Sequence, residues 1–226
     1  ADRQAWYLNR PEMLQRVRDR SRRYLYYSAG ELEKRGMPTE LALLPIVESS
    51  YNPMAYSRAR ASGIWQFIPS TGKTYHLEQN WWHDQRRDII ASTGAALDYL
   101  QTIYEMQGDW HLALASYNWG ENAVARAINK NRAKGLPTDY LSLTMPNETR
   151  SYVPKLQALK SIIAQPALFN VSLDPIPTTV DGLSLARLFN PEVTWREGVL
   201  LEGWPPRGVY SAIHTEQYLY AETVGD

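Results

Sequence analysis

The 226-residue sequence predicts an all-α domain over residues 1–165, followed by an irregular, partly β appendage over residues 166–226. The helical domain is predicted by apolar residues that recur at helical spacing, with no convincing strand-like alternation before residue 165. The appendage is predicted by prolines that interrupt the rest of the chain, at Pro166, Pro175, Pro177, Pro191, Pro205 and Pro206. A chain of this length can bury a real core in one domain of roughly 150 to 200 residues.

Residues 1–36 are interpreted as an opening segment and one long helix. Pro11 suits the first turn of a helix, and Gly36 suits its end. The arginines between Arg16 and Arg23 are expected to form a solvated face.

A second helix is predicted to begin at Met37–Thr39 and to be kinked by Pro45. No charged side chain occurs from Leu41 to Val47, and apolar residues lie on all sides of this helix, which is typical of a buried helix. A single carboxylate, Glu48, ends the run.

Two effects are expected to act on the proton of Glu48 in the same direction. Desolvation and the negative end of the helix dipole both disfavour the carboxylate, so we expect a raised pKa. Such an acid can deliver a proton near neutral pH. The alternative is a glutamate exposed in the last turn, hydrogen-bonded to Ser49, Ser50 or backbone.

Residues 50–62 are predicted to form a loop, and an apolar segment follows from Gly63 to Pro69. The next helix is predicted over residues 84–106, with Gly108 after its end. Gly94 in this helix costs about 1 kcal/mol of helix propensity, which we expect to be offset by close approach of another helix.

Further helices are predicted over residues 110–117, 121–131 and 148–163, the last one capped by Asn147. We expect about six or seven helices in all. Within the appendage, strand-like pieces at 178–180, 198–201 and 217–221 flank one short helical run, Ser184 to Phe189.

Composition excludes some function classes and only hints at others. The net charge is zero, which gives no electrostatic basis for binding nucleic acid or acidic lipid. The 8 Trp and 15 Tyr against 3 Phe suit a groove for hydroxyl-rich ligands, although an aromatic core would look the same. There are no cysteines, and the 4 histidines lack zinc-ligand spacing, so we expect neither metal nor cofactor.

Membrane and export signals are not found in the sequence. No apolar stretch reaches the roughly 20 residues of a membrane span, and no signal peptide is present. If the natural precursor is exported, its leader has been removed here.

Besides Glu48, two short segments carry polar side chains among apolar residues, one at Gln66 and one at Tyr117-Asn118. Gln66 lies between Trp65 and Phe67, where an unpaired amide would cost about 1–3 kcal/mol if buried. It therefore either braces backbone or faces a ligand. Tyr117-Asn118 ends an apolar helix and could equally be a plain cap.

Together with Glu48 these segments form three motifs in a fixed order: Glu48-Ser49, Gly63-x-x-Gln66 and Ser116-Tyr117-Asn118. Asn52-Pro53 follows the first motif, and Glu148-Thr149-Arg150-Ser151-Tyr152-Val153 lies downstream of the third. The pattern resembles the soluble lytic murein transglycosylase domain, which is similar in fold to goose-type lysozyme. The resemblance covers about residues 35–163. It implies a lysozyme-like catalytic domain that cleaves the β-1,4 bond between N-acetylmuramic acid and N-acetylglucosamine in peptidoglycan without water.

The resemblance also implies the chemistry. Glu48 would act as the single general acid and base, the substrate's acetamido group would stabilise the developing cation, and the muramoyl C6 hydroxyl would close a 1,6-anhydro ring. Two-carboxylate glycosidases need a second acid, and no Asp or Glu occurs from Ser49 to Leu77. Glu121 and Glu148 could still approach in the fold.

Substrate-binding roles are carried over position by position from the same resemblance. Ser57 would lie near the acetamido group, and Gln66 would hold the substrate or the loop beside Glu48. Tyr117 would hydrogen-bond near the Glu48 carboxylate or the acetamido group. The remaining candidates are Asn118 at the turn, Tyr152 and Glu148 on the far side of the cleft, and Trp65 as a sugar-stacking or cleft-floor residue, with Trp81, Trp82 and Trp119 as groove or core residues.

Partners and location follow from the resemblance alone: peptidoglycan glycan strands, a monomer, and the periplasm, with an outer-membrane lipid anchor absent from this chain. Enzymes of this type usually continue into LysM repeats, and Gly182 to Pro191 resembles one LysM helix. The alternatives are a hydrolytic muramidase of goose-lysozyme type, a peptidoglycan-binding protein that does not cleave, and a helical interaction domain without a sugar ligand.

Overall fold

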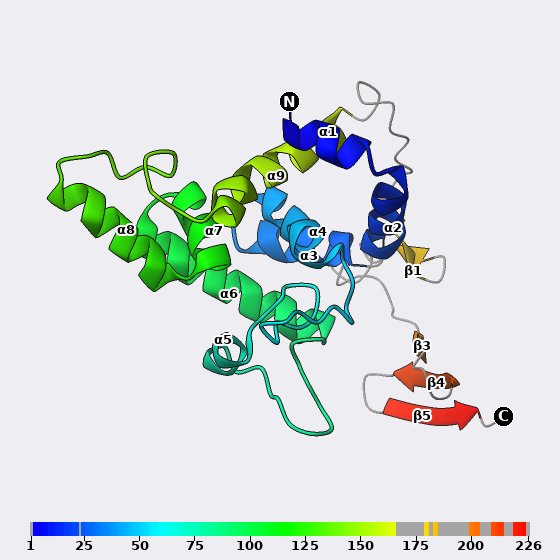
Figure 1. Cartoon of the computed structure of the whole chain (residues 1–226). Helices are drawn as coiled ribbons and strands as arrows, with labels where there is room; N and C mark the ends of the chain where they lie inside the picture. The colour runs from blue at the N-terminus through cyan, green and yellow to red at the C-terminus, as the bar shows by residue number, and fades with distance from the viewer. Residues whose placement is uncertain are drawn as a thin grey trace. The chain divides into compact units, whose positions relative to one another are not determined.

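The computed structural model describes residues 2–22, 24–165, 179–180, 183–184, 199–203, 209–214 and 219–224. The chain separates into two compact units, Ala1–Ile176 and Pro177–Asp226. The described helices all belong to the first unit, which is therefore mostly helical, as predicted (Figure 1). No helix in the described ranges is long and apolar enough to cross a membrane.

The first unit begins with α1 (Asp2–Leu8), α2 (Pro11–Ser21) and α3 (Leu25–Lys34). The prediction of one long helix after Pro11 is wrong, because the helix is interrupted before α3 starts. Helix α2 ends at Ser21 with Arg22 as its C-cap, and the buried Ser21 hydroxyl donates to the Arg18 carbonyl at 3.1 Å. The break lets α2 pack against α1 while α3 packs against the next segment and α6.

The core helix is a 3₁₀ turn, η1 (Thr39–Leu43), followed by α4 (Leu44–Ser49). Pro45 lies in the first turn of α4, where a missing N–H is tolerated, so it starts the α-helix and does not kink it. Leu41, Leu44 and Ile46 are buried, as predicted for this run. The helix ends at Ser50, which has a left-handed φ of 52°.

Two helices follow, the short α5 (Pro69–Thr74) and the long α6 (Ile89–Gln107). The α6 helix starts later than predicted because Asp88 is its N-cap and accepts a hydrogen bond from the Ala91 amide at 2.7 Å. Gly108 ends it with a φ of 70°. The expectation for Gly94 is wrong, since no neighbouring atom lies within 4 Å of the position a Cβ would take.

The last three helices are α7 (Trp110–Trp119), α8 (Glu121–Ala133) and α9 (Asn147–Ala164). Gly120, with a φ of 96°, joins α7 directly to α8. Asn147 does not cap α9 as predicted; Pro146 is the N-cap and Asn147 is the first helical residue. Helices α1 to α9 exceed the predicted number because α1 and α5 were not foreseen and the helix predicted after Pro11 is split into α2 and α3.

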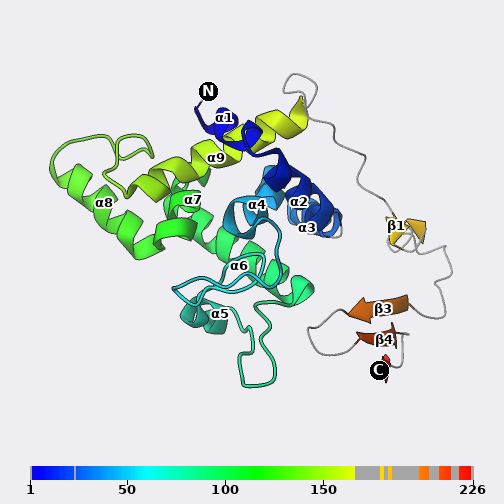
Figure 2. The same cartoon turned by 45° about the vertical axis from the view of Figure 1, so that its right-hand side comes forward.

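Packing brings three helix ends together. Helix α9 packs against α1, α4 and α7, and α6 packs against α3 and α7 (Figures 1 and 2). The core between them contains fully buried side chains such as Leu97, Leu100 and Ile103 of α6. As a result, the C-terminal ends of α4 and α7 lie near the first turns of α9.

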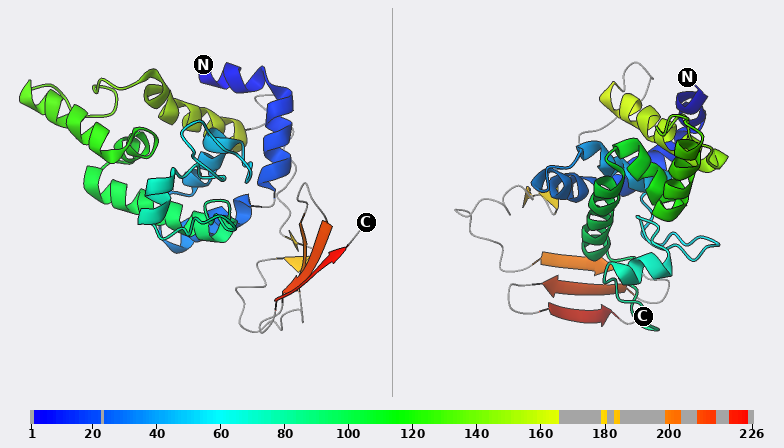
Figure 3. Two further views of the ribbon diagram at one scale, coloured as in Figure 1. Left: turned by 60° about the horizontal axis from the view of Figure 1, so that its bottom comes forward. Right: turned by 90° about the vertical axis from the view of Figure 1, so that its left-hand side faces the viewer.

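The second unit contains two antiparallel pairings. Strands β1 (Thr179–Val180) and β2 (Leu183–Ser184) pair with each other. Strands β3 (Val199–Gly203), β4 (Val209–His214) and β5 (Leu219–Val224) form a sheet in that order (Figure 3). Ser184, where the predicted helical run begins, lies in β2 and not in a helix, and the rest of that run and most of the LysM-like segment lie outside the described residues.

Candidate active site

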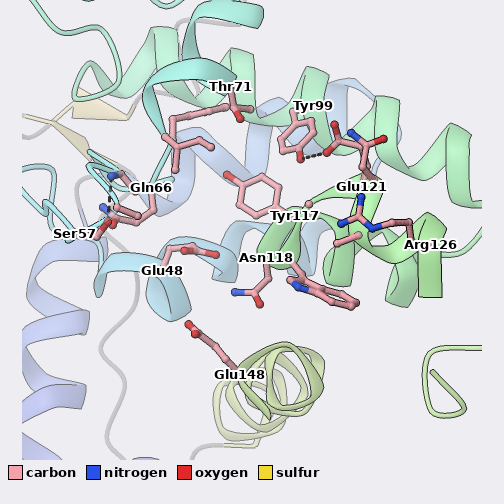
Figure 4. A pocket seen from close by; sticks show the side chains of 18 residues that line it. Glu48, Ser57, Gln66, Thr71, Tyr99, Tyr117, Asn118, Glu121, Arg126 and Glu148 are labelled. Atoms are coloured by element: carbon pink, nitrogen blue, oxygen red, sulfur yellow. Dashed lines mark hydrogen bonds between the residues drawn. The ribbon is translucent and has the colours of Figure 1, made fainter. Parts of the chain in front are cut away.

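A cavity of about 650 Å³ lies in the helical unit, beside the end of α4. Its wall is built by α4, the irregular segment 57–68, the start of α5, α6, the α7–α8 junction and the first turn of α9. Figure 4 shows side chains from all these elements pointing into one space. Among the predicted site residues, the cavity is lined by Glu48, Ser57, Gln66, Tyr117, Asn118 and Glu148.

Glu48 is half-buried in the last turn of α4 and faces the cavity. Its pKa is raised from 4.5 to about 7, first because burial penalises the charged form. A hydrogen bond from Tyr152 lowers this pKa, the nearby charge of Glu148 raises it, and Lys155 lowers it. The group is therefore divided between acid and carboxylate near neutral pH.

Tyr152 is buried at 2% exposure on α9, and its hydroxyl donates a hydrogen bond to Oε1 of Glu48. Burial and the charge of Glu48 raise the pKa of Tyr152 well above its usual value. The phenol consequently stays protonated and remains a donor. It fixes the orientation of the Glu48 carboxyl group and stabilises its charged form.

The resemblance implies a hydrogen bond from Tyr117 near the Glu48 carboxylate or to the acetamido group of a substrate, and within the described residues its hydroxyl bonds elsewhere. Its hydroxyl donates to the backbone carbonyl of Trp65 at 2.8 Å, and its ring packs against Tyr99 with centroids 5.4 Å apart. Burial and the charge of Glu48 raise the pKa of Tyr117 well above its usual value. Tyr117 thus links α7 to the segment that carries Gln66, while Tyr152 is the tyrosine that hydrogen-bonds to Glu48.

Gln66 is a backbone brace, one of the two interpretations left open by the sequence. It has a left-handed φ of 52°, and its Nε2 donates to the carbonyls of Gly63 at 2.8 Å and Ala55 at 3.3 Å. The same side chain also lines the cavity. Bracing and ligand contact are therefore compatible at this position.

Ser57 closes a tight turn in the same segment. Its amide donates to the Ala61 carbonyl at 2.9 Å, and its Oγ accepts from the Ala61 amide at 3.1 Å. Neither bond uses the hydroxyl proton of Ser57. That proton can be donated to a ligand in the cavity.

Arg86 anchors this segment from behind. Arg86 is 5% exposed, and its guanidinium is paired with Asp84 and donates to the carbonyls of Arg60 at 2.7 Å and Phe67 at 3.0 Å. The backbone of Arg86 also packs on Gly63, where a Cβ would lie 1.8 Å from its carbonyl oxygen. Gly63 is therefore required by close backbone contact as well as by its φ of 81°.

The side chains of Asn118 and Ser49 mainly make hydrogen bonds within the protein that hold neighbouring segments together. Asn118 Oδ1 accepts from the Thr149 hydroxyl at 2.8 Å, which ties the end of α7 to α9. The Ser49 hydroxyl lies within hydrogen-bond distance of the carbonyls of Pro45 and Ile64. Asn118 nevertheless lines the cavity beside Glu148, which is exposed on the first turn of α9 (Figure 4).

Three of the four tryptophans considered, Trp65, Trp81 and Trp82, are placed differently from expectation. Trp65 is fully buried, and its indole N–H donates to the Thr93 hydroxyl at 2.9 Å, so its ring cannot stack on a sugar in the cavity. Trp81 and Trp82 are 88% and 90% exposed, which makes them neither core nor cavity wall. Trp119 does line the cavity.

Sequence reasoning did not single out Tyr99 and Arg126 as site residues, and it considered Glu121 only as a possible second carboxylate; all three line the cavity. The Tyr99 hydroxyl donates to Oε2 of Glu121 at 2.9 Å. Helical spacing would have placed Tyr99 beside Ala95, Ala96 and Ile103, but nothing local pointed to a ligand. No cluster of three or more His, Cys, Asp or Glu suited to a metal occurs in the described part of the chain.

Comparison with known proteins gives a family and several relatives. The family described as "Transglycosylase SLT domain" matches residues 26–138. The chain is 48% identical over 183 residues to "Membrane-bound lytic murein transglycosylase D" of Escherichia coli (strain K12), covering 80% of this chain and 40% of that protein. It is 39% identical over 148 residues to a "Putative tributyltin chloride resistance protein" of Alteromonas sp. (strain M-1), covering 65% of this chain and 71% of that protein.

A more distant relative is "Membrane-bound lytic murein transglycosylase C" of Glaesserella parasuis serovar 5 (strain SH0165), 26% identical over 140 residues, which are 56% of this chain and 38% of that protein. The chain thus spans about two fifths of the length of the first relative.

Proposed function

This chain belongs to the transglycosylase SLT domain family, and we propose that it is a peptidoglycan lytic transglycosylase with Glu48 as its single general acid and base. The observation that carries the proposal is the position of Glu48 on the cavity wall with a pKa of about 7. A group with that pKa can give up a proton and take one back at neutral pH, as this reaction requires.

In the first step, protonated Glu48 donates its proton to the glycosidic oxygen between N-acetylmuramic acid and N-acetylglucosamine. The bond from the muramoyl C1 to that oxygen breaks, and the N-acetylglucosamine end leaves as an alcohol. The oxygen of the substrate's own acetamido group stabilises the positive charge at C1. The hydrogen bond from Tyr152 supports the carboxylate that Glu48 becomes.

In the second step, the Glu48 carboxylate accepts the proton of the muramoyl C6 hydroxyl. The C6 oxygen then bonds to C1, which closes the 1,6-anhydro ring and restores protonated Glu48. No water is consumed, and no metal or cofactor takes part in these steps.

The other cavity residues have supporting roles in the proposal. The Ser57 hydroxyl would donate a hydrogen bond to the acetamido oxygen. Gln66, through its bonds to backbone carbonyls, would hold the segment that carries Ser57 in position for this contact. Tyr117 would keep the same segment joined to α7. Asn118 would contact sugar through its Nδ2, which makes no hydrogen bond within the described residues.

A hydrolytic muramidase is the second candidate, and Glu148 is the observation that favours it. This carboxylate lines the same cavity and lies close enough to Glu48 to raise its pKa. A water molecule held by Glu148 could attack C1 in place of the C6 hydroxyl. Under the first proposal Glu148 only binds substrate and keeps Glu48 protonated.

Mass spectrometry of the products from purified peptidoglycan tests the two candidates. A transglycosylase releases muropeptides lighter than the hydrolysed ones by one water molecule, and the Glu48→Gln protein releases none. If the unaltered protein released products of the hydrolysed mass, and both Glu48→Gln and Glu148→Gln released none, the protein would be a muramidase. Binding of insoluble peptidoglycan with no products from the unaltered protein would mean a non-catalytic binding protein.

We propose the same two-part organisation that the sequence predicts, with a catalytic domain over residues 1–165 and a partly β appendage over residues 166–226. The antiparallel pairings β1–β2 and β3–β4–β5 support the β character of the appendage. The murein substrate named for the relatives supports a periplasmic location. Their description as membrane-bound supports the proposal of an outer-membrane lipid anchor.

A further inference from the structure

The cavity has a second polar end that the proposed acid–base chemistry does not use. It is formed by Tyr99, Glu121 and Arg126, on the far side of the Tyr117 ring from Glu48 (Figure 4). Glu121 is held in place by the Tyr99 hydroxyl at 2.9 Å. This end of the cavity is therefore ordered before any ligand arrives.

Arg126 is the only lysine or arginine among the described residues that line the cavity. Its side chain is exposed, and Figure 4 shows its guanidinium directed from α8 into the cavity, beside Glu121. Within the described residues it makes no hydrogen bond and no ion pair, not even with Glu121. Its donors are thus available to a ligand.

Two other cationic side chains on α8, Lys130 and Arg132, do not line the cavity. Arg132 donates to Asn129 at 3.0 Å and lies outside the cavity wall, and Lys130 is exposed outside it as well. Lys130 is one helical turn from Arg126. It is a matched control for the loss of one positive charge from the same helix.

We propose that Arg126 binds a carboxylate carried by the muramoyl side group of the glycan strand. A guanidinium presents a planar fork of N–H donors that matches a carboxylate in two parallel hydrogen bonds. Uncharged N-acetylglucosamine offers no such group, so the contact would distinguish muramoyl units from other sugars. The inference rests on the proposed function, because it assumes that peptidoglycan enters this cavity.

Two sources can supply the carboxylate. In strands with peptide stems, the lactyl carboxyl is an amide and the stem residues carry the charge. In strands without stems, the lactyl carboxylate itself is free. Both present the same chemistry to Arg126.

The test measures binding in the Glu48→Gln background, which prevents cleavage. Dissociation constants are compared for soluble strands with stems, for the same strands stripped by an amidase, and for an N-acetylglucosamine oligomer of equal length. Arg126→Gln should weaken binding of at least one carboxylate-bearing strand by about five- to tenfold and leave the oligomer unchanged. Lys130→Gln should change none of the three.

The pattern across the ligands identifies the source. A loss for stem-bearing strands alone assigns the contact to the peptide, and a loss for stripped strands alone assigns it to the lactyl group. Arg126→Lys should keep part of the affinity, since the charge remains. Added salt should reduce the difference between the parent and Arg126→Gln.

Equal losses for all three ligands, or no loss for any, would overturn the role of Arg126. The proposed function would survive either result, because product analysis tests it separately. If the Glu48→Gln protein bound none of the ligands and the unaltered protein released no products, the proposed function itself would fail. Circular dichroism of each variant distinguishes these results from loss of folding.

Discussion

The hydroxyl of Tyr152 donates a hydrogen bond to the carboxyl group of Glu48, across 104 positions of the chain. The bond joins the second turn of α9 to the end of α4, and it is made inside the protein, where Tyr152 is 2% exposed. Burial raises the pKa of Glu48, and this hydrogen bond limits the increase. The pair therefore sets the proton affinity of the proposed catalytic acid.

Replacement of the acid is the first prediction. Glu48→Gln should lower cleavage of peptidoglycan by at least ~10²–10⁴-fold, because the amide can neither donate nor accept the proton. Sugar binding and the fold should be kept. Glu40→Gln, which removes a surface carboxylate paired with Lys160, is the control and should cleave normally. Substantial activity in Glu48→Gln would remove Glu48 from its role.

Tyr152→Phe should move the pH dependence of cleavage upward. Without the hydroxyl, the Glu48 carboxylate loses the hydrogen bond that favours it, so its pKa increases and the acid stays protonated to higher pH. Activity measured from pH 5 to 9 shows this as a displaced alkaline limb. Tyr117→Phe is the matched control, because its hydroxyl donates to the Trp65 carbonyl and not to Glu48. Equal displacement in both variants would contradict the assignment.

Tyr117→Phe should instead lower turnover more than stability. Losing the bond to Trp65 costs about 1 kcal/mol of folding free energy, which a domain of this size tolerates. The segment carrying Gln66 and Ser57 would then be less well held to α7, so the substrate would be less well oriented. Steady-state rates and urea unfolding of the same preparation measure the two effects. An unchanged rate would make Tyr117 a core residue only.

The raised pKa of Glu48 also predicts how stability depends on pH. The folded protein binds the proton more tightly than the unfolded chain, so its stability should fall as pH rises from about 4.5 to about 7. Above that window Glu48→Gln should be more stable than the unaltered protein by up to about 3 kcal/mol, and near pH 4.5 the difference should nearly vanish. Urea unfolding at both pH values checks this. A difference that does not depend on pH would be inconsistent with the shift.

Two glycines give opposite predictions for the same change to alanine. Gly63→Ala should destabilise the protein by several kcal/mol, roughly 3 or more, because the new Cβ meets the Arg86 carbonyl oxygen at a left-handed φ. Gly94→Ala should stabilise it by about 0.5–1 kcal/mol, because the helix gains propensity and no neighbour is within 4 Å. Thermal unfolding of the two variants compares them directly. Similar behaviour of both would show that close backbone contact does not explain Gly63.

Local sequence features determined much of the fold and of the site. The uncharged run before Glu48 determined a buried helix ending in one carboxylate, because apolar side chains at every position can be satisfied only in a core. Periodicity and turn residues predicted helices over 84–106, 110–117, 121–131 and 148–163, and the structure has helices over 89–107, 110–119, 121–133 and 147–164. The ordered motifs around Glu48, Gln66 and Tyr117 also indicated the correct family.

Only the tertiary structure decided which groups meet. Tyr152, and not Tyr117, bonds to Glu48, because the packing of α9 on α4 depends on contacts distant in sequence. Trp65 turned inward to Thr93 for the same reason, and Tyr99, Glu121 and Arg126 came to one cavity wall from two helices. The periodicity of apolar side chains predicts which face of a helix is buried, but the packing of the whole domain determines which other helix lies against that face.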